Sequence, residues 1–303
     1  MEIHSPKEFI AQMQEMIKFM ERLHRQEYKI PVSPQTKIDQ LKELTELRML
    51  AKSDSWPKAV EQEQIMGDSE QDKINKAMIL LMSLIKMDIE NKTILELGCD
   101  EGYSSFLALK GMYAKKSVGY DKKEKNWDKL KNKEGLHLTT DWEVVQSNGP
   151  YDIIFVNDLI DHSEDFEKEL EKIKTIKTNG CRIFVRCHPW CSRHGMHLHN
   201  QLNKAYIHLV FSEDELFNMG IKCNKTTHRL LDPITSYKKL FQKTGFSILS
   251  TEVIKTEVEN FFIQNEAVMR RIKEKWQTMQ DYHDGSKFPR EFLEIEAVDF
   301  ILI

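Results

Sequence analysis

The chain has 303 residues, of which 40% are hydrophobic and 30% charged, and its formal net charge is −4. This length suits one large α/β domain or a domain with a helical annex, and the charge gives no global drive toward nucleic acid. No run approaches the roughly 18 apolar residues that span a membrane, and the N-terminus lacks the plan of a signal peptide. Five cysteines without framework spacing indicate a reducing compartment. We therefore expect a cytoplasmic protein with no membrane partner.

The first part of the chain has helical periodicity. Apolar residues recur at steps of three and four between residues 9 and 23, and Pro31 and Pro34 end that pattern. Further helices are expected at 38–51 and 74–89. We expect residues 1–88 to form a helical N-terminal extension or lid, and residues 89–303 to form a separate domain.

From residue 93 onward the pattern changes to alternating strands and helices. Strands are expected at 93–97, 117–120, 136–139, 152–156, 181–187, 246–253 and 293–303. Helices are expected at 166–176, 234–243 and 266–282, and the lysine-rich segment 122–133 is interpreted as a solvated helix face. Five strand–helix repeats predict βαβ units, so the fold class is α/β with a doubly wound, mostly parallel sheet.

The segment TILELGCDEGY, residues 93–103, joins a buried strand to a tight acidic turn with glycine at both ends. Gly98 and Gly102 let the backbone approach a ligand more closely than any side chain would permit. Glu96 lies at the carboxyl end of the strand, where open α/β sheets bind ligands. The turn has no P-loop lysine, which disfavours a nucleoside triphosphate.

This turn resembles motif I of the class I S-adenosylmethionine (SAM) methyltransferases, (D/E)-x-G-x-G-x-G, with Asp100 in place of the middle glycine. The resemblance implies that SAM is the cofactor and that its methionine end lies along Gly98, Cys99, Asp100 and Gly102. It also implies that Glu96 contacts the ammonium group of SAM or an ordered water. The sheet would then have seven strands, the last of them antiparallel beside the fifth.

Asp121 ends the second expected strand in the segment VGYD. It follows the glycine turn by about 20 residues, where an acidic side chain can accept both ribose hydroxyls of an adenosine-containing ligand. A helix cap is the alternative interpretation of Asp121. NAD would satisfy the same two features, although the glycine spacing favours SAM.

Asp141 and Trp142 end the third expected strand. The family resemblance implies that Asp141 accepts the amino group of adenine and that Trp142 forms an apolar wall. The alternative is a helix cap followed by a buried tryptophan. Both interpretations remain open at this stage.

Residues 151–162, YDIIFVNDLIDH, resemble motif IV and the strand-end signature of a large type 11/12-like subgroup of these methyltransferases. Asn157 and Asp158 are expected where the fourth strand opens onto the cofactor methyl group. Asp158, Asp161 and His162 have i, i+3, i+4 spacing, so a helical turn would place them on one face. Such a face can abstract a proton or hold a divalent ion.

The same three residues resemble the E-x-x-E-H metal site of small-RNA 2′-O-methyltransferases, with aspartate in place of both glutamates. Asp158, Asp161 and His162 are therefore metal candidates, although the shorter side chains do not favour a metal. A simpler alternative is that Asp161 and His162 orient the loop. We interpret Asp158 and His162 as catalytic candidates.

Residues 186–199, RCHPWCSRHGMHLH, hold four of the 11 histidines of the chain directly after the fifth expected strand. Their spacing fits no familiar zinc module. A similar run forms a substrate-pocket loop in small-molecule and glycan-type members of the family. One histidine can act as a general base or complete a metal site with the preceding motif, and we favour His188 and His194 as functional candidates.

These patterns together predict a SAM-dependent methyltransferase that acts by direct in-line displacement. The chain has neither a Pro-Cys nucleophile nor an N/D-P-P-Y/F/W run, which disfavours methylation of bases. We therefore expect O-methylation of a small molecule or glycan. A metal-assisted RNA 2′-O-methyltransferase, with nucleic acid as acceptor, remains an alternative. A non-catalytic SAM-fold binding module is another, and the aspartate at position 100 favours it.

Overall fold

The computed structural model describes residues 34–60, 69–82, 84, 87–157, 165–223, 234–278 and 290–303. The chain divides into two compact units, residues 1–50 and 51–303, which are described separately. Helix α2 (Pro34–Lys52) belongs almost entirely to the first unit and corresponds to the helix expected at 38–51. The helical pattern at residues 9–23 lies outside the described residues, and the domain boundary after residue 88 stays a prediction.

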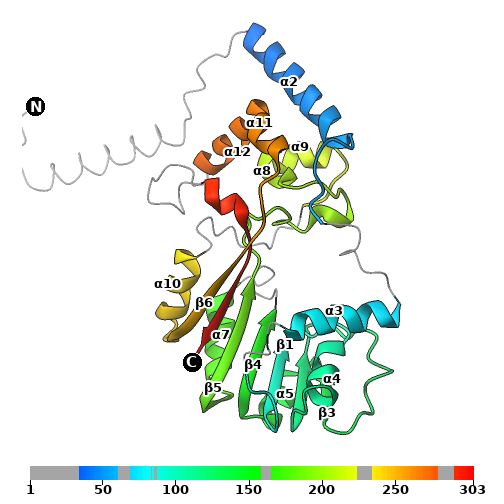
Figure 1. Ribbon diagram of the computed structural model, residues 1–303, viewed down its shortest axis with the longest axis vertical. Coiled ribbons are helices and arrows are strands. Elements are labelled where there is room, and N and C mark those ends of the chain that lie inside the picture. Colours follow the sequence, from blue (N-terminus) through cyan, green and yellow to red (C-terminus); the bar gives the residue numbers. More distant parts are fainter. Residues whose placement is uncertain are drawn as a thin grey trace, which may run out of the picture. The chain divides into compact units, whose positions relative to one another are not determined.

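The second unit is built on one seven-stranded sheet with the order β3-β2-β1-β4-β5-β7-β6 (Figure 1). The strands are β1 (Thr93–Leu97), β2 (Lys116–Tyr120), β3 (Leu136–Thr139), β4 (Tyr151–Asn157), β5 (Lys177–Cys187), β6 (Ile248–Lys255) and β7 (Ile295–Leu302). Strands β1 to β5 pair in parallel, whereas β7 lies antiparallel between β5 and β6. This topology confirms the predicted sheet, including the antiparallel last strand beside the fifth.

Helices cover both faces of the sheet. One face packs against α5 (Trp142–Asn148), α7 (Phe166–Lys174) and α10 (Thr235–Lys243), and the other against α3 (Glu70–Met82) and α4 (Tyr103–Lys110). Strand β4 shows why: Ile154 and Val156 face the first layer, and Ile153 and Phe155 face the second. A strand buried on both faces is expected to be a continuous apolar run, as β4 is.

A further layer of short helices lies beyond the ends of β5 and β7 (Figure 1). It contains η1 (Leu198–Asn200), α8 (Ile207–Val210), α9 (Glu213–Asn218), α11 (Asn260–Gln264), α12 (Glu266–Thr278) and η3 (Arg290–Glu294). Trp56 is central to it, because its ring lies 5.3 to 6.3 Å from those of Phe211, Phe261 and Phe262. Its Nε1 also donates a hydrogen bond to the Ala205 carbonyl at 2.9 Å. This helical layer, as we call it, therefore joins distant parts of the chain.

Two local predictions differ from the structure. The helix expected at 74–89 is observed as α3, which spans Glu70–Met82. It begins at Glu70 because Ser69 and Asp72 form a reciprocal cap, in which each side chain accepts the backbone N–H of the other. The expected helix at 122–133 is wrong, since this segment forms turns. Its buried Trp127 donates to a distant carbonyl, and this tertiary contact overrides the helical preference. No described helix is long and apolar enough to cross a membrane.

Candidate cofactor and acceptor site

The glycine turn joins β1 to α4 and bends through two left-handed residues, Gly98 with φ 84° and Gly102 with φ 82°. A Cβ atom on Gly102 would lie 2.6 Å from a terminal carbon of Leu138, so another residue there would displace that side chain and strain the left-handed backbone. Among the described residues, a Cβ atom on Gly98 would meet only the Asn157 carbonyl, at 3.4 Å. No described side chain covers Gly98 beside the end of β4, and the absence of a Cβ atom there lets a ligand approach the backbone.

Asp100, the residue that departs from the family motif, is also left-handed, with φ 47°. Aspartate is one of the few non-glycine residues that tolerate this region. Its N–H donates to Asp121 Oδ2 at 3.1 Å, and its carbonyl accepts from Trp127 Nε1 at 2.7 Å. Its side chain is 61% exposed and pairs with Lys125 at 2.7 Å. The carboxylate thus lies toward solvent while the backbone holds the turn.

Glu96 lies buried beneath the turn and accepts hydrogen bonds from Ser104 Oγ, at 2.6 Å, and from Ser105 Oγ. Burial raises the pKa of this carboxyl to about 7, although the two serine hydrogen bonds oppose the shift. These serines were not among the predicted site residues. Two hydroxyls in the first turn of α4, directly after the glycine turn, were the available signal. Contact between Glu96 and the ammonium group of SAM stays a prediction.

Asp121 and Cys99 complete the environment of the turn. Asp121 Oδ1 accepts the Lys123 N–H at 3.2 Å, and its Oδ2 accepts the Asp100 N–H. Both carboxylate oxygens therefore accept hydrogen bonds from the backbone. The same acceptor capacity suits a pair of ribose hydroxyls. Cys99 is buried, which raises the pKa of its thiol well above the ordinary value, so it stays a neutral packing group.

Asp141 and Trp142 lie where α5 begins. Asp141 caps the helix, because its Oδ1 accepts the Glu143 N–H at 2.8 Å. Trp142 packs edge-on against Tyr120, with ring centroids 5.4 Å apart. The helix-cap alternative is thus realised, and a role of either residue toward adenine stays a prediction.

The end of β4 places Asn157 opposite Arg186 of β5 and close to Gly98. Asp158, Asp161 and His162, the candidates that follow, lie outside the described residues. Within the part of the chain that the structure describes, no group of three or more His, Cys, Asp or Glu residues could hold a metal ion. The roles of these three residues stay predictions.

Residues 188–199 form what we call the histidine loop, which leaves β5 and enters the helical layer. The loop is firmly packed: Trp190, Met196 and Leu198 are buried. A Cβ atom on Gly195 would lie 2.0 Å from the Trp190 carbonyl oxygen, so only glycine fits there. The same carbonyl lies 2.6 Å from Nε2 of the buried His208. The loop is therefore a well-packed part of the structure.

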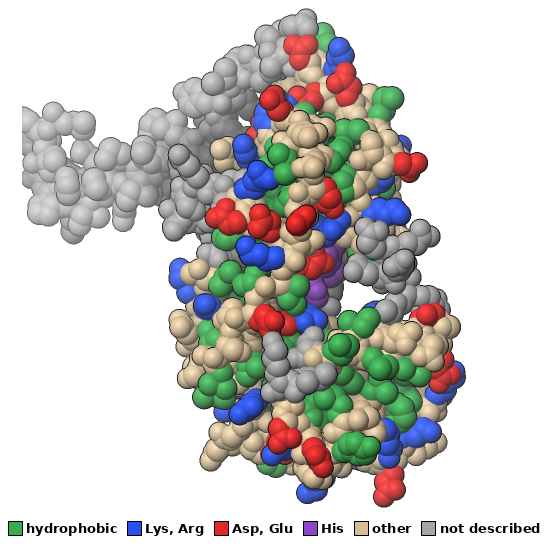
Figure 2. All heavy atoms as spheres, viewed as in Figure 1, with side chains coloured by type: hydrophobic (Ala, Val, Ile, Leu, Met, Phe, Trp, Pro, Cys, Tyr) green, Lys and Arg blue, Asp and Glu red, His purple; other side chains and the backbone are tan. Residues whose placement is uncertain are grey.

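The four histidines of this loop gather around His194. Its ring centroid lies 5.2 Å from that of His188, 5.9 Å from that of His197 and 6.3 Å from that of His199. Burial, followed by the charge of His194, lowers the pKa of His199. Figure 2 shows histidine atoms at the surface where the helical layer meets the sheet. The structure thus brings together the two histidines predicted to be functional.

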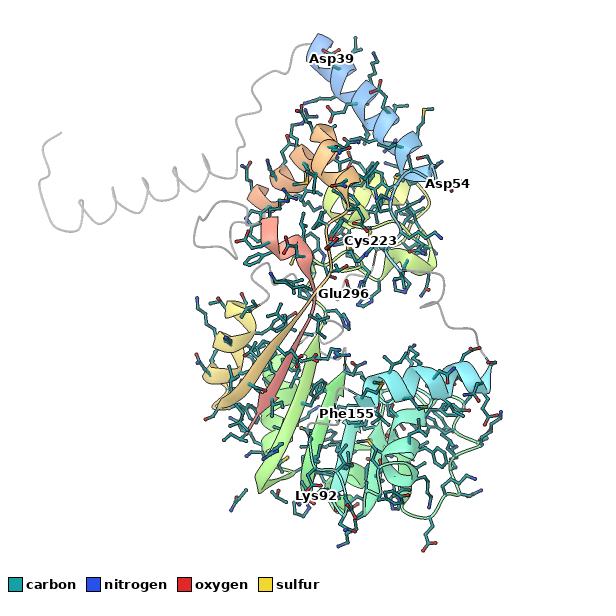
Figure 3. All side chains as sticks on the ribbon, in the orientation of Figure 1. Asp39, Asp54, Lys92, Phe155, Cys223 and Glu296 are labelled. Atoms are coloured by element: carbon teal, nitrogen blue, oxygen red, sulfur yellow. The ribbon has the colours of Figure 1, made fainter. Side chains whose placement is uncertain are left out.

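Glu296 joins this cluster from the start of β7, at the junction with the helical layer (Figure 3). Its Oε1 lies 3.2 Å from Nδ1 of His194. Burial alone would raise its pKa, but His194, with smaller contributions from His188 and Arg193, lowers the pKa below the ordinary value. Sequence reasoning missed Glu296. An acid at the first positions of an antiparallel strand beside β5 was the available signal.

The chain is similar to several known proteins. A family model described as a methyltransferase domain matches residues 70–251. A SAM-dependent methyltransferase from Mesorhizobium loti is 12% identical, with 74% of this chain and 95% of that chain covered and a TM-score of 0.44. A putative SAM-dependent methyltransferase from Listeria monocytogenes is 16% identical, with 76% and 97% covered and a TM-score of 0.47.

Magnesium protoporphyrin IX methyltransferase from Synechocystis PCC 6803 is 13% identical, with 86% of this chain and 98% of that chain covered and a TM-score of 0.44. No curated protein matches the chain significantly. The family assignment accordingly depends on the family model, which spans more than half of the chain.

Proposed function

The chain belongs to the class I SAM-dependent methyltransferases, and on that premise we propose that it methylates a hydroxyl group of a small molecule or glycan. The observation that carries this proposal is the histidine cluster with Glu296 at the carboxyl edge of the sheet. The strand order separates the ends of β1 and β5 by β4 alone. At about 4.8 Å per strand, the glycine turn and the histidine loop start roughly 10 Å apart.

The described residues fit SAM. The methionine end would lie along the turn at Gly98, Asp121 would accept the ribose hydroxyls, and Asp141 and Trp142 would lie toward adenine. When bound, SAM would supply an activated sulfonium methyl group for the acceptor oxygen.

A hydroxyl acceptor must lose its proton, whereas a carboxylate acceptor needs no base. Imidazole suits this task because its ordinary pKa lies close to neutral pH. We propose His188 and His194 as the candidates for the base, with His194 favoured because an acidic residue contacts it. Asp158 and His162, which follow Asn157 in the sequence, remain further candidates.

Transfer of a radiolabelled methyl group from SAM to a panel of alcohols, phenols, glycans, amines, carboxylic acids and RNA tests this proposal. We expect label on a hydroxyl compound, and a loss of about 100-fold or more in rate for His194→Gln with SAM affinity unchanged. Label confined to amines or carboxylates would contradict O-methylation. Label on RNA that EDTA abolishes would establish the metal-assisted RNA alternative instead.

A further inference from the structure

We propose that Glu296 is the positioning residue of His194: its carboxylate holds the N–H at Nδ1 and leaves Nε2 to take the proton of the acceptor hydroxyl. This inference rests on the proposed hydroxyl methylation. It adds a residue, contributed by the last strand of the sheet, that acts through His194 and not on the acceptor itself.

The side chains of His194 and Glu296 lie close together and are largely buried. Nδ1 of His194 lies 3.2 Å from Oε1 of Glu296, and the side chains are only 11% and 29% exposed. The ring is not aligned for a hydrogen bond to this oxygen, so it must rotate to form one. Contacts of this kind in ligand-free enzymes are commonly loose and tighten when the substrate binds.

The two carboxylate oxygens of Glu296 are not equally satisfied. Oε1 pairs with His194, whereas Oε2 is buried and accepts no hydrogen bond from any described residue. A buried acceptor left in this state is rare and requires an explanation, such as a catalytic role. Arg193, the nearby cation, donates to the Lys58 carbonyl and forms an ion pair with Glu259 at 2.6 Å. Glu296 is therefore directed to the imidazole.

The other ring nitrogen of His194 is available. Nε2 forms no hydrogen bond with any described residue and is not among the fully buried atoms that lack a partner, so it can take the proton of a hydroxyl. A carboxylate at one nitrogen of an imidazole fixes the tautomer and supports the positive charge that develops on protonation. The other three histidines of the loop lie around the ring, with centroids 5.2 to 6.3 Å from its own.

The proton moves from the acceptor hydroxyl to His194. The O–H bond of the acceptor breaks as the Nε2–H bond of His194 forms, and the electron pair stays on the acceptor oxygen. The resulting imidazolium faces the Glu296 carboxylate and later releases its proton to solvent. Glu296 itself stays ionised throughout, as its lowered pKa allows.

The tautomer of His194 tests the inference without an acceptor. Long-range 1H–15N NMR of the 15N-histidine-labelled protein, assigned with His194→Gln, distinguishes the two neutral forms. We expect the Nδ1–H form in the wild type and a shift toward the Nε2–H form in Glu296→Ala. The matched control is Glu294→Ala, since Glu294 lies two residues earlier and pairs with Lys255 at 3.4 Å. An Nε2–H form in the wild type would overturn the inference.

Kinetics on an identified acceptor provide the second test. We expect kcat to fall about 100-fold in Glu296→Ala, with KM and SAM affinity within twofold of the wild type and partial rescue by Glu296→Asp. A purely structural role would instead lower the melting temperature and raise KM, with kcat retained, and would refute positioning. If the wild type methylates no hydroxyl at all, the proposed function fails. The NMR experiment still shows whether Glu296 fixes the tautomer of His194.

Discussion

Asp100 combines a strained backbone with an exposed side chain. Its left-handed φ of 47° would cost an alanine about 1 kcal/mol, whereas the ion pair of its carboxylate with Lys125 is exposed and contributes little. Asp100→Ala should therefore lower the unfolding free energy by about 1 kcal/mol in urea denaturation. Asp100→Gly, which restores the family motif, should not lower it. Equal losses in both variants would show that the side chain, and not φ, determines stability.

The buried carboxyl of Glu96 should make stability depend on pH. Its folded pKa of about 7 exceeds the ordinary 4.5, so between these values the folded protein binds a proton that the unfolded chain lacks. The unfolding free energy should therefore fall as pH rises from about 4.5 to about 7, by at most about 3 kcal/mol from this group. The difference between wild type and Glu96→Gln, measured by denaturation at each pH, isolates this contribution. A difference that stays constant with pH would contradict the assignment.

Residue-level chemistry was only partly predictable. Spacing along the chain predicts that Gly98, Gly102 and Asp121 belong to the site, because turns and strand ends recur at regular intervals in an α/β chain. The role of Glu296 did not follow, since its contact with His194 depends on how a C-terminal strand aligns with β5. Local patterns do not encode that register.

The histidine loop depends on one glycine. Gly195 allows the loop to fold against the Trp190 carbonyl, where a Cβ atom would lie 2.0 Å away. Gly195→Ala should therefore displace the histidines and abolish methyl transfer, while SAM affinity, which depends on the glycine turn, should stay within twofold. Calorimetry and the transfer assay measure both properties. Gly180→Ala is the matched control, because its Cβ atom would meet no atom of the described residues within 4 Å. Full activity of Gly195→Ala would contradict a site in this loop.

Strands β5 and β7 are joined by a buried ion pair. Arg186 donates from Nε and Nη2 to the two oxygens of Asp299, at 2.8 and 2.6 Å, with side chains 15% and 9% exposed. Asp299→Ala leaves a buried guanidinium without this partner and should cost about 3 kcal/mol. The double variant Arg186→Met, Asp299→Leu should recover at least half of that loss. Denaturant unfolding measures both, and a neutral single variant would show that the pair does not stabilise the strands.

At the scale of the whole molecule, the sheet was predictable, whereas the packing of the helical layer was not. Alternating strand and helix patterns repeat regularly, and five such repeats with two late strands already determine the topology. The helical layer has no such repeat, because Trp56 packs on rings more than 150 positions further along the chain. The contacts of Trp56 arise only in the folded molecule.

Binding of SAM at the glycine turn is the central claim, and isothermal titration calorimetry tests it most directly. Wild type, Asp121→Ala and the exposed control Asp128→Ala should be titrated with SAM at one pH. We predict saturable binding to the wild type and Asp128→Ala, and at least tenfold weaker binding to Asp121→Ala, since one of its principal hydrogen-bond acceptors is lost. No binding to the wild type at millimolar SAM, or equal affinity in all three proteins, would contradict the account.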